Sequence, residues 1–381
     1  MKKLIYLDYA STTPQSNESV AAMQQYFKDD FYNPSALYLA AKNVSKNLEN
    51  LRASVAGILQ VRPTEVFFGA GSTEANNIII QGIMNLYIEC NMIASAIEHD
   101  SVLNIAKKYN SKLVGVNDAG IIDVLELAKI INDKTVLISC MSANNEIGTV
   151  QPVSDIARLI NKIKKERLQK GNTTPLFLHV DASQSFNYLP LLPHALGIDF
   201  AVVGGSKIYG PKQTSVFFIK NGIKLEPLII GGGQEKGVRS GTENVAGIAG
   251  LVAAIKQTDD MRIAESERLL QLRNILVEGL KKIDPSCVIN GSLKNRLPNN
   301  VHVTFNNIDN ETLVMQLDEN GIMVATGSAC NASSDAPSHV LSAIGLSGKQ
   351  AQSSIRITTG RSTTKSDITV LLDSLVKFLI R

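Results

Sequence analysis

Short apolar runs alternate with amphipathic segments along the first two-thirds of the chain. The runs are four to six residues long and predict strands at 66–69, 92–97, 112–116, 135–140, 176–181, 200–204 and 215–219. Segments between many of them have helical patterns, at 73–89, 101–109, 123–131 and 153–168. Continuous apolar strands separated by helices are typical of a sheet that is buried on both faces. The pattern therefore predicts an α/β domain with a large, mainly parallel sheet.

The pattern changes after the glycine-rich segment at 231–244. Two long helices are predicted at 245–257 and 262–282, followed by strands near 287–290 and 301–305 and a last helix near 366–380. This region predicts a smaller α+β domain. We expect residues 13–250 to form the large domain, and residues 1–12 and 251–381 to form the small one.

Composition limits the possible functions without selecting one. Of 381 residues, 44% are apolar and 19% are charged, which is ordinary for a soluble globular protein. A formal net charge of +3 is too small to indicate direct binding of nucleic acid. No uninterrupted apolar run approaches 18 residues, so we expect no membrane segment. The four cysteines are scattered without a C-x-x-C pair, which predicts no metal site, no disulfide framework and a reducing cytoplasm.

Several polar side chains follow directly after predicted strands. Lys207 follows the strand at 200–204, where it is either an ordinary loop lysine or a nucleophile. Asp181 ends the strand at 176–181, with Gln184 three residues later. Thr73 follows the strand at 66–69, where we expect it to be the N-cap of a helix whose free N–H groups could bind phosphate. Because open α/β sheets bind ligands at the carboxyl ends of their strands, these parts together predict a pyridoxal phosphate site.

Other residues add to this set, although each has a plain structural alternative. His99 lies just past the strand at 92–97, yet a lone histidine is more often structural than catalytic. Asn144 and Asn145 precede a turn and could either cap a helix or orient a ligand. Cys330 lies among small polar residues, where a thiolate stays accessible as a nucleophile. Arg356 is either exposed on an edge strand or buried, where it could clamp a substrate carboxylate.

The chain resembles the cysteine desulfurases, members of the class V aminotransferase group, in a series of motifs that occur in the same order along the sequence. The resemblance covers nearly the whole chain and rests on YLDYASTTP (6–14), NPSA (33–36), GSTEANN (71–77), EH (98–99), NNEIGTVQP (144–152), HVDASQ (179–184), KIYGPK (207–212), GGGQEKGVRSGTEN (231–244), GSAC (327–330), PSHVL (337–341) and SSIR (353–356). It implies an aminotransferase-like fold of type I, pyridoxal phosphate as cofactor and conversion of L-cysteine to L-alanine. The segment after Cys330 is similar to the form that serves iron–sulfur cluster assembly.

The resemblance also implies a role for each matching residue. Lys207 would bind the cofactor covalently, and Cys330 would receive the sulfur as a persulfide. Asp181 would hold the charged ring nitrogen of the cofactor. Gln184 would lie near the ring oxygen, and His99 would stack on the ring and take part in proton transfer.

The phosphate and the substrate have their own implied contacts. Thr73 would bind the phosphate, and Thr242 would reach the phosphate of a partner subunit, which implies a homodimer. Asn145 and Arg356 would hold the substrate carboxylate. A sulfur-acceptor protein, such as an iron–sulfur scaffold, is the implied partner.

The chain departs from the family pattern beside Lys207. The family usually has Ser-x-His-Lys there, whereas this chain has Gly204-Gly205-Ser206-Lys207, so that only Ser206 retains a hydroxyl for the phosphate. The usual PKGIG reads PKQTS at 211–215, and Tyr38 stands where a histidine is expected. Three alternatives therefore stay open: a selenocysteine lyase, a transaminase, and a degenerate subunit without activity.

Overall fold

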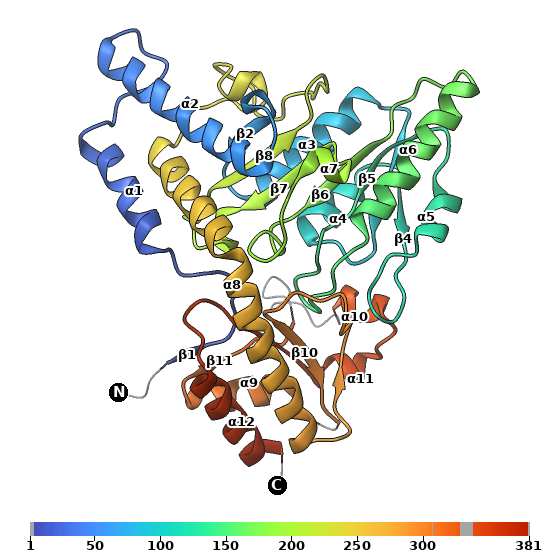
Figure 1. Cartoon of the computed structure of the whole chain (residues 1–381). Coiled ribbons are helices and arrows are strands. Elements are labelled where there is room, and N and C mark those ends of the chain that lie inside the picture. The colour runs from blue at the N-terminus through green and yellow to red at the C-terminus, as the bar shows by residue number, and fades with distance from the viewer. Residues whose placement is uncertain (1–3, 307, 328–337, 380–381) are drawn as a thin grey trace.

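A seven-stranded sheet forms the centre of the larger part of the molecule (Figure 1). The computed structural model describes residues 4–306, 308–327 and 338–379. The sheet has the spatial order β2 (Val66–Gly69), β8 (Ser215–Ile219), β7 (Phe200–Gly204), β6 (Phe177–Asp181), β5 (Thr135–Ser139), β3 (Asn91–Ser95) and β4 (Ser111–Val114). Strands β3 to β7 pair in parallel, and β8 is antiparallel to both of its neighbours. The predicted mainly parallel sheet is confirmed.

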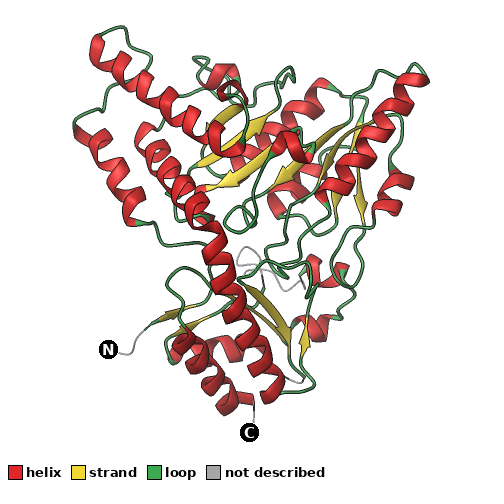
Figure 2. Cartoon of the chain, viewed as in Figure 1, coloured by secondary structure: helices red, strands yellow, loops and turns green. Residues whose placement is uncertain are grey.

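Helices cover both faces of this sheet, as the layers in Figure 2 show. Alternate strand residues point to opposite faces. Phe67 therefore packs with α3 (Ser72–Leu86) and α4 (Asp100–Ala106) on one face. Phe68 packs with α2 (Leu39–Leu59), α6 (Val153–Gln169) and the first part of α8 (Val245–Ile283) on the other. Both faces are therefore buried, which explains why the strands are apolar throughout. The helices of this part are α1 (Asn17–Lys28), α2 (Leu39–Leu59), α3 (Ser72–Leu86), α4 (Asp100–Ala106), α5 (Val124–Ile130), α6 (Val153–Gln169) and α7 (Pro193–Leu196).

The two predicted helices at 245–257 and 262–282 are one helix, α8 (Val245–Ile283), so that prediction is wrong. The polar residues at 257–260 include no glycine or proline that would end a helix. Instead, Asp259 accepts a hydrogen bond from the Arg262 guanidinium at 2.6 Å, one turn along the same helix. Helix α8 packs on the core of the large sheet near its start and on a second core further along. The predicted boundary near residue 250 falls within this helix and stays a prediction.

The smaller part surrounds the second half of α8 (Figure 1). An antiparallel sheet has the order β12 (Ser354–Thr358), β10 (Asn300–Thr304) and β9 (Val288–Ile289), and a parallel pair joins β1 (Ile5–Tyr6) to β11 (Ile322–Met323). Its helices are α9 (Asn310–Glu319), α10 (His339–Ala343), α11 (Gly348–Ala351) and α12 (Lys365–Leu379). Across the described ranges, no helix is both long and apolar enough to cross a bilayer.

Candidate active site

A cavity of about 710 Å³ lies at the edge of the large sheet where its parallel strands end. Residues that follow β2, β3, β5, β6 and β7 line it, together with a segment of the N-terminal region and one residue of β12. The predicted site residues that line it are Thr73, His99, Asn145, Asp181, Gln184, Ser206, Lys207 and Arg356. The sequence order separates these residues, and the common edge of the sheet brings them together.

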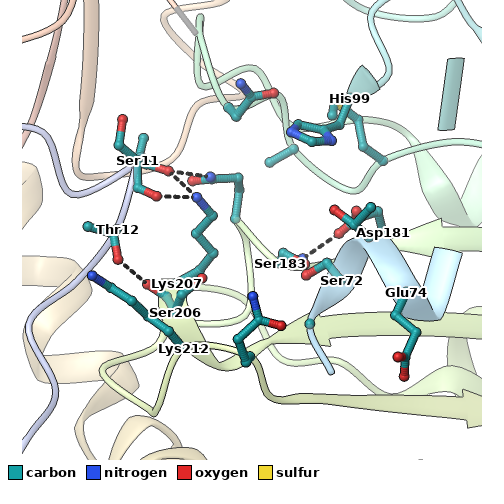
Figure 3. A pocket seen from close by; sticks show the side chains of 18 of the residues that line it. Ser11, Thr12, Ser72, Glu74, His99, Asp181, Ser183, Ser206, Lys207 and Lys212 are labelled. Atoms are coloured by element: carbon teal, nitrogen blue, oxygen red, sulfur yellow. Dashed lines mark hydrogen bonds between the residues drawn. The ribbon is translucent and has the colours of Figure 1, made fainter. Parts of the chain in front are cut away.

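Lys207 enters the cavity from a short 3₁₀ turn, Gly205–Lys207, that follows β7 directly. Its Nζ donates to the carbonyl oxygen of Ala10 at 2.9 Å and to the carbonyl oxygen of Ser11 (Figure 3). The Asn187 amide donates to the Lys207 carbonyl at 2.7 Å and fixes the backbone of the turn. Lys207 is therefore held inside the cavity, which favours the nucleophile over the ordinary loop lysine.

Asp181 and His99 lie on the side of the cavity opposite Ser11 in Figure 3. The Asp181 carboxylate accepts from the Asn76 amide and from the Ser183 backbone N–H, both at 2.9 Å. Two donors fix the carboxylate, yet it still lines the cavity. His99 is the N-cap of α4, and its Nδ1 accepts from the Ser101 N–H at 3.0 Å. A neutral His99 ring therefore carries its proton on Nε2.

The start of α3 forms another wall, but Thr73 is not its N-cap as predicted. The N-cap is Gly71, at φ +94°. A side chain is disfavoured at this φ, which explains why the capping position is a glycine and the hydroxyl residues come after it. Thr73 is exposed in the first turn and still lines the cavity beside Ser72.

Arg356 and Asn145 form the wall nearest the small part. Arg356 is 1% exposed, which excludes the alternative of an exposed arginine on an edge strand. Its Nη2 donates to Asp8 Oδ1 at 2.7 Å and to Ser11 Oγ at 2.8 Å, and its Nη1 donates to the Asn145 carbonyl at 3.1 Å. Its Nε is buried without a hydrogen-bond partner among the described residues. Asn144 instead stabilises a turn, because its Oδ1 accepts from Glu146 N–H and Ile147 N–H.

A second carboxyl lies behind the cavity wall. Glu98 is fully buried, and one of its oxygens accepts from the backbone N–H of Met141. Burial, together with the nearby negative charge of Asp181, raises the pKa of Glu98 to about 8. Glu98 is therefore mostly neutral at pH 7 and adds little charge beside Asp181.

Among the predicted site residues that the structure describes, Thr242 is exposed and does not line the cavity. Cys330 lies outside the described residues. Of the other cysteines, Cys140 and Cys287 are buried, whereas Cys90 is half-buried.

Sequence reasoning also missed several residues of the wall. These are Ser72, Ser183, Lys212 and Gln213, together with the Ala10–Thr12 segment. The motifs GSTEANN and HVDASQ contain the first two, so a count of hydroxyls near strand ends could have found them. Within the described residues, no group of three or more His, Cys, Asp or Glu side chains is arranged to hold a metal ion.

The donor set of the cavity fits pyridoxal phosphate. An amine, a carboxylate held by two donors, an imidazole and a helix start all border one space. A helix start attracts a phosphate, a carboxylate pairs with a protonated ring nitrogen, and a lysine amine bonds to an aldehyde carbon. The cavity volume lies within the range usual for small-molecule and cofactor sites.

Comparisons with known proteins agree with this chemistry. The family model Aminotransferase class-V matches residues 5–371. A relative named cysteine desulfurase IscS, from Dictyoglomus turgidum, is 37% identical over 386 residues, which cover 100% of this chain and 95% of the relative. A solved NifS-like protein superposes with a TM-score of 0.90 at 31% identity, covering 99% of this chain and 100% of that chain. A structure of SspA in complex with cysteine superposes with a TM-score of 0.80 at 31% identity, covering 94% of this chain and 98% of that chain.

The family model, the curated relatives and the solved structures all match over nearly the full length. In this chain, the fold places the lysine, the carboxylate and the imidazole around one cavity. The predicted type I fold is thereby confirmed. The chain belongs to the aminotransferase class-V family and, within it, to the pyridoxal-phosphate-dependent cysteine desulfurases.

Proposed function

We propose that the protein takes sulfur from L-cysteine at this cavity and passes it to Cys330, for use in iron–sulfur or other thio-cofactor assembly. The observation that carries the proposal is the convergence of Lys207, Asp181, His99 and Arg356 on one cavity. The similar protein SspA, whose structure is a complex with cysteine, supports L-cysteine as the substrate. A degenerate subunit would be expected to have lost some of these groups.

Each residue has a distinct task in this proposal. The Arg356 guanidinium and Asn145 hold the substrate carboxylate, since both line the same wall. The bound cofactor supplies an electron sink for the substrate carbon, and Asp181 keeps its ring nitrogen charged. Lys207 would hold the cofactor covalently, and its amine, when free, would take the substrate α-proton. His99 is placed to exchange a proton through Nε2.

Sulfur transfer needs a thiolate, which we assign to Cys330. The thiolate attacks the sulfur of the substrate, so that a sulfur–sulfur bond forms and the carbon–sulfur bond breaks. The electron pair of the broken bond stays on carbon, which is protonated and leaves as alanine. Cysteine and the enzyme thiol thus give alanine and an enzyme persulfide, and no further oxidant is needed.

We also propose that the enzyme is a cytoplasmic homodimer in which Thr242 reaches the partner's phosphate. The exposure of Thr242 supports this, because a buried side chain could not reach another subunit. Leu37, Leu39 and Ile230 are 87%, 74% and 86% exposed, and large exposed apolar side chains favour a protein interface. A sulfur-acceptor protein would be a second, transient partner.

The test is a comparison of two variants during turnover of L-cysteine. Cys330→Ala should keep the visible absorbance of the bound cofactor and lose alanine and persulfide formation. Lys207→Ala should lose both the visible absorbance and the activity, and Cys90→Ala should behave as wild type. Undiminished alanine formation by Cys330→Ala would contradict the role of the thiol and favour a lyase of the selenocysteine lyase kind, which breaks the bond to carbon without an enzyme thiol.

A further inference from the structure

Gly204 ends β7 beside the start of α3, and the hydroxyl of Ser72 fills the space next to it. A Cβ built on Gly204 would lie only 2.2 Å from Ser72 Oγ, but 3.5 Å from Ser72 Cβ and 3.7 Å from Ser183 Oγ. Among the residues that the structure describes, the Ser72 hydroxyl is therefore the only close conflict with a Cβ at position 204. A hydroxyl on α3 and a side chain at the end of β7 compete for one place.

The Ser72 hydroxyl is held in this place by a short hydrogen-bonded chain (Figure 3). It lies 2.9 Å from Ser183 Oγ, which in turn accepts from the backbone N–H of Gly204 at 3.2 Å. The Ser183 N–H donates to Asp181 Oδ1 at 2.9 Å. Ser183 is 6% exposed, so its hydroxyl is fixed by buried neighbours. The chain links the start of α3 to the carboxylate of the site.

The surroundings of Ser72 suit an anion. Gly71 caps α3 without a side-chain hydrogen bond, and the first N–H groups of a helix have no partner within the helix. The carboxylate of Glu74, in the same first turn, is already paired with Arg239 Nε at 3.1 Å and accepts from Ala70 N–H at 2.9 Å. The Arg239 guanidinium thus compensates the negative charge of Glu74, which would otherwise repel a phosphate.

We propose that Ser72 is a ligand of the cofactor phosphate and supplies from α3 the hydroxyl that the end of β7 lacks at Gly204. The proposal rests on the proposed function, because it assumes that pyridoxal phosphate occupies the cavity. Ser183 is a positioning residue that donates to Ser72, so that the Ser72 proton points to the phosphate. In the segment before Lys207, the sequence alone leaves only Ser206 with a hydroxyl for the phosphate.

The first test compares pyridoxal phosphate with pyridoxal, which lacks the phosphate. Each is titrated into cofactor-free protein, without cysteine, and the visible absorbance reports binding. Ser72→Ala should weaken pyridoxal phosphate about tenfold or more, because a hydrogen bond to a charged group is lost. Binding of pyridoxal should stay within about twofold of wild type. Gly71 is the N-cap, so Ser72→Ala removes no helix cap.

The second test moves the hydroxyl back to the strand. In the double variant Ser72→Ala/Gly204→Ser, the new side chain has room, because the conflicting Oγ is gone. Gly204 has φ −93° and ψ 132°, which any residue adopts. We expect the affinity for pyridoxal phosphate to return to within about threefold of wild type. Ser54→Ala, a serine of α2 outside the cavity, should leave both affinities unchanged.

Each outcome has a defined meaning. Equal weakening of both compounds by Ser72→Ala, or no weakening, would overturn the assignment while leaving the proposed function intact. Specific weakening without recovery in the double variant would overturn the exchange with position 204. Failure of the wild-type protein to bind pyridoxal phosphate would overturn the proposed function and this inference together.

Discussion

The raised pKa of Glu98, which lies close to the site residue Asp181, predicts how the stability of the protein depends on pH. Its carboxyl is fully buried beside the charge of Asp181, and these two causes raise its pKa to about 8. Its second oxygen has no hydrogen-bond partner among the described residues. A charged Glu98 would therefore be poorly solvated and would repel Asp181.

The sign and size of the effect follow from the two states of the protein. An unfolded chain ionises Glu98 at its ordinary pKa of 4.5, whereas the folded protein keeps the proton up to about 8. The stabilisation is thus fully present below pH 4.5 and is lost as pH rises towards 8. The difference in pKa corresponds to about 5 kcal/mol. At an unfolding entropy of about 0.8 kcal/mol/K for a chain of this length, this equals about 6 °C in Tm.

The assay compares wild type with Glu98→Gln by thermal unfolding at pH 5, 6, 7 and 8. The amide has nearly the same shape but no charge, so its stability lacks this pH dependence. We expect wild type to lose up to about 5 °C relative to Glu98→Gln between pH 5 and 8, because about 4 kcal/mol of the stabilisation is lost over these three pH units. Other titrating groups are common to both proteins and cancel in the difference.

Glu65 is a matched control, because it is another buried glutamate with the opposite shift. Burial by itself raises its pKa, but hydrogen bonds from the backbone N–H groups of Arg62 and Asn221 outweigh burial and lower it. His194 Nε2 also lies 3.0 Å from Glu65 Oε2 and forms a charge pair only when protonated, so the control is made in a His194→Gln background. There Glu65 stabilises the protein above its ordinary pKa, and adding Glu65→Gln should gain nothing relative to that background from pH 5 to 8. A Tm difference between Glu98→Gln and wild type that stays constant over this range would refute the reasoning.

Two further predictions concern single buried cations. Arg356→Lys should raise the KM for L-cysteine about tenfold or more without changing the cofactor absorbance, because an ammonium cannot make a two-point contact with a carboxylate; an unchanged KM would contradict the assignment. Glu235→Gln should lower the free energy of unfolding by about 3 kcal/mol, since it removes the buried carboxylate 2.8 Å from the buried Arg52 guanidinium and leaves only the exposed Glu49 carboxylate, at 3.1 Å, as a charge partner. Urea denaturation measures both this variant and a control, Glu166→Gln, which removes the carboxylate partner of the exposed Lys162. The control should lower the free energy of unfolding by less than about 1 kcal/mol.

Much of the fold could be predicted from the sequence because both faces of the sheet are buried. Apolar runs such as VFFG and FAVVG match β2 and β7 residue for residue. The failures have local causes. A break was predicted at 258–261, but these residues lie within α8, where Asp259 and Arg262 pair along one helix. Thr73 was expected to be the N-cap of α3, but the N-cap is Gly71, whose φ is positive.

The site was only partly predictable, for a physical reason. Lys207, Asp181 and His99 could be grouped in advance, because parallel strands bring their carboxyl ends to one edge. Ser72 could not be distinguished from an ordinary helix residue, since its importance depends on the space beside Gly204. The burial of Arg356 depends on Asp8, which lies 348 residues away in the chain. Such a contact leaves no pattern in the sequence near either residue.

The N-terminal segment at 8–12 joins the two halves of the site. Asp8 and Ser11 accept from Arg356, and the carbonyls of Ala10 and Ser11 accept from Lys207. One stretch of backbone thus contacts both the amine that we assign to the cofactor and the guanidinium that we assign to the substrate. In its proposed role, Lys207 would give up at least one of these hydrogen bonds when its nitrogen becomes covalently bound. We therefore expect loading of the cofactor to alter the contacts of the segment that also contacts Arg356, so that cofactor binding and recognition of the substrate carboxylate are coupled.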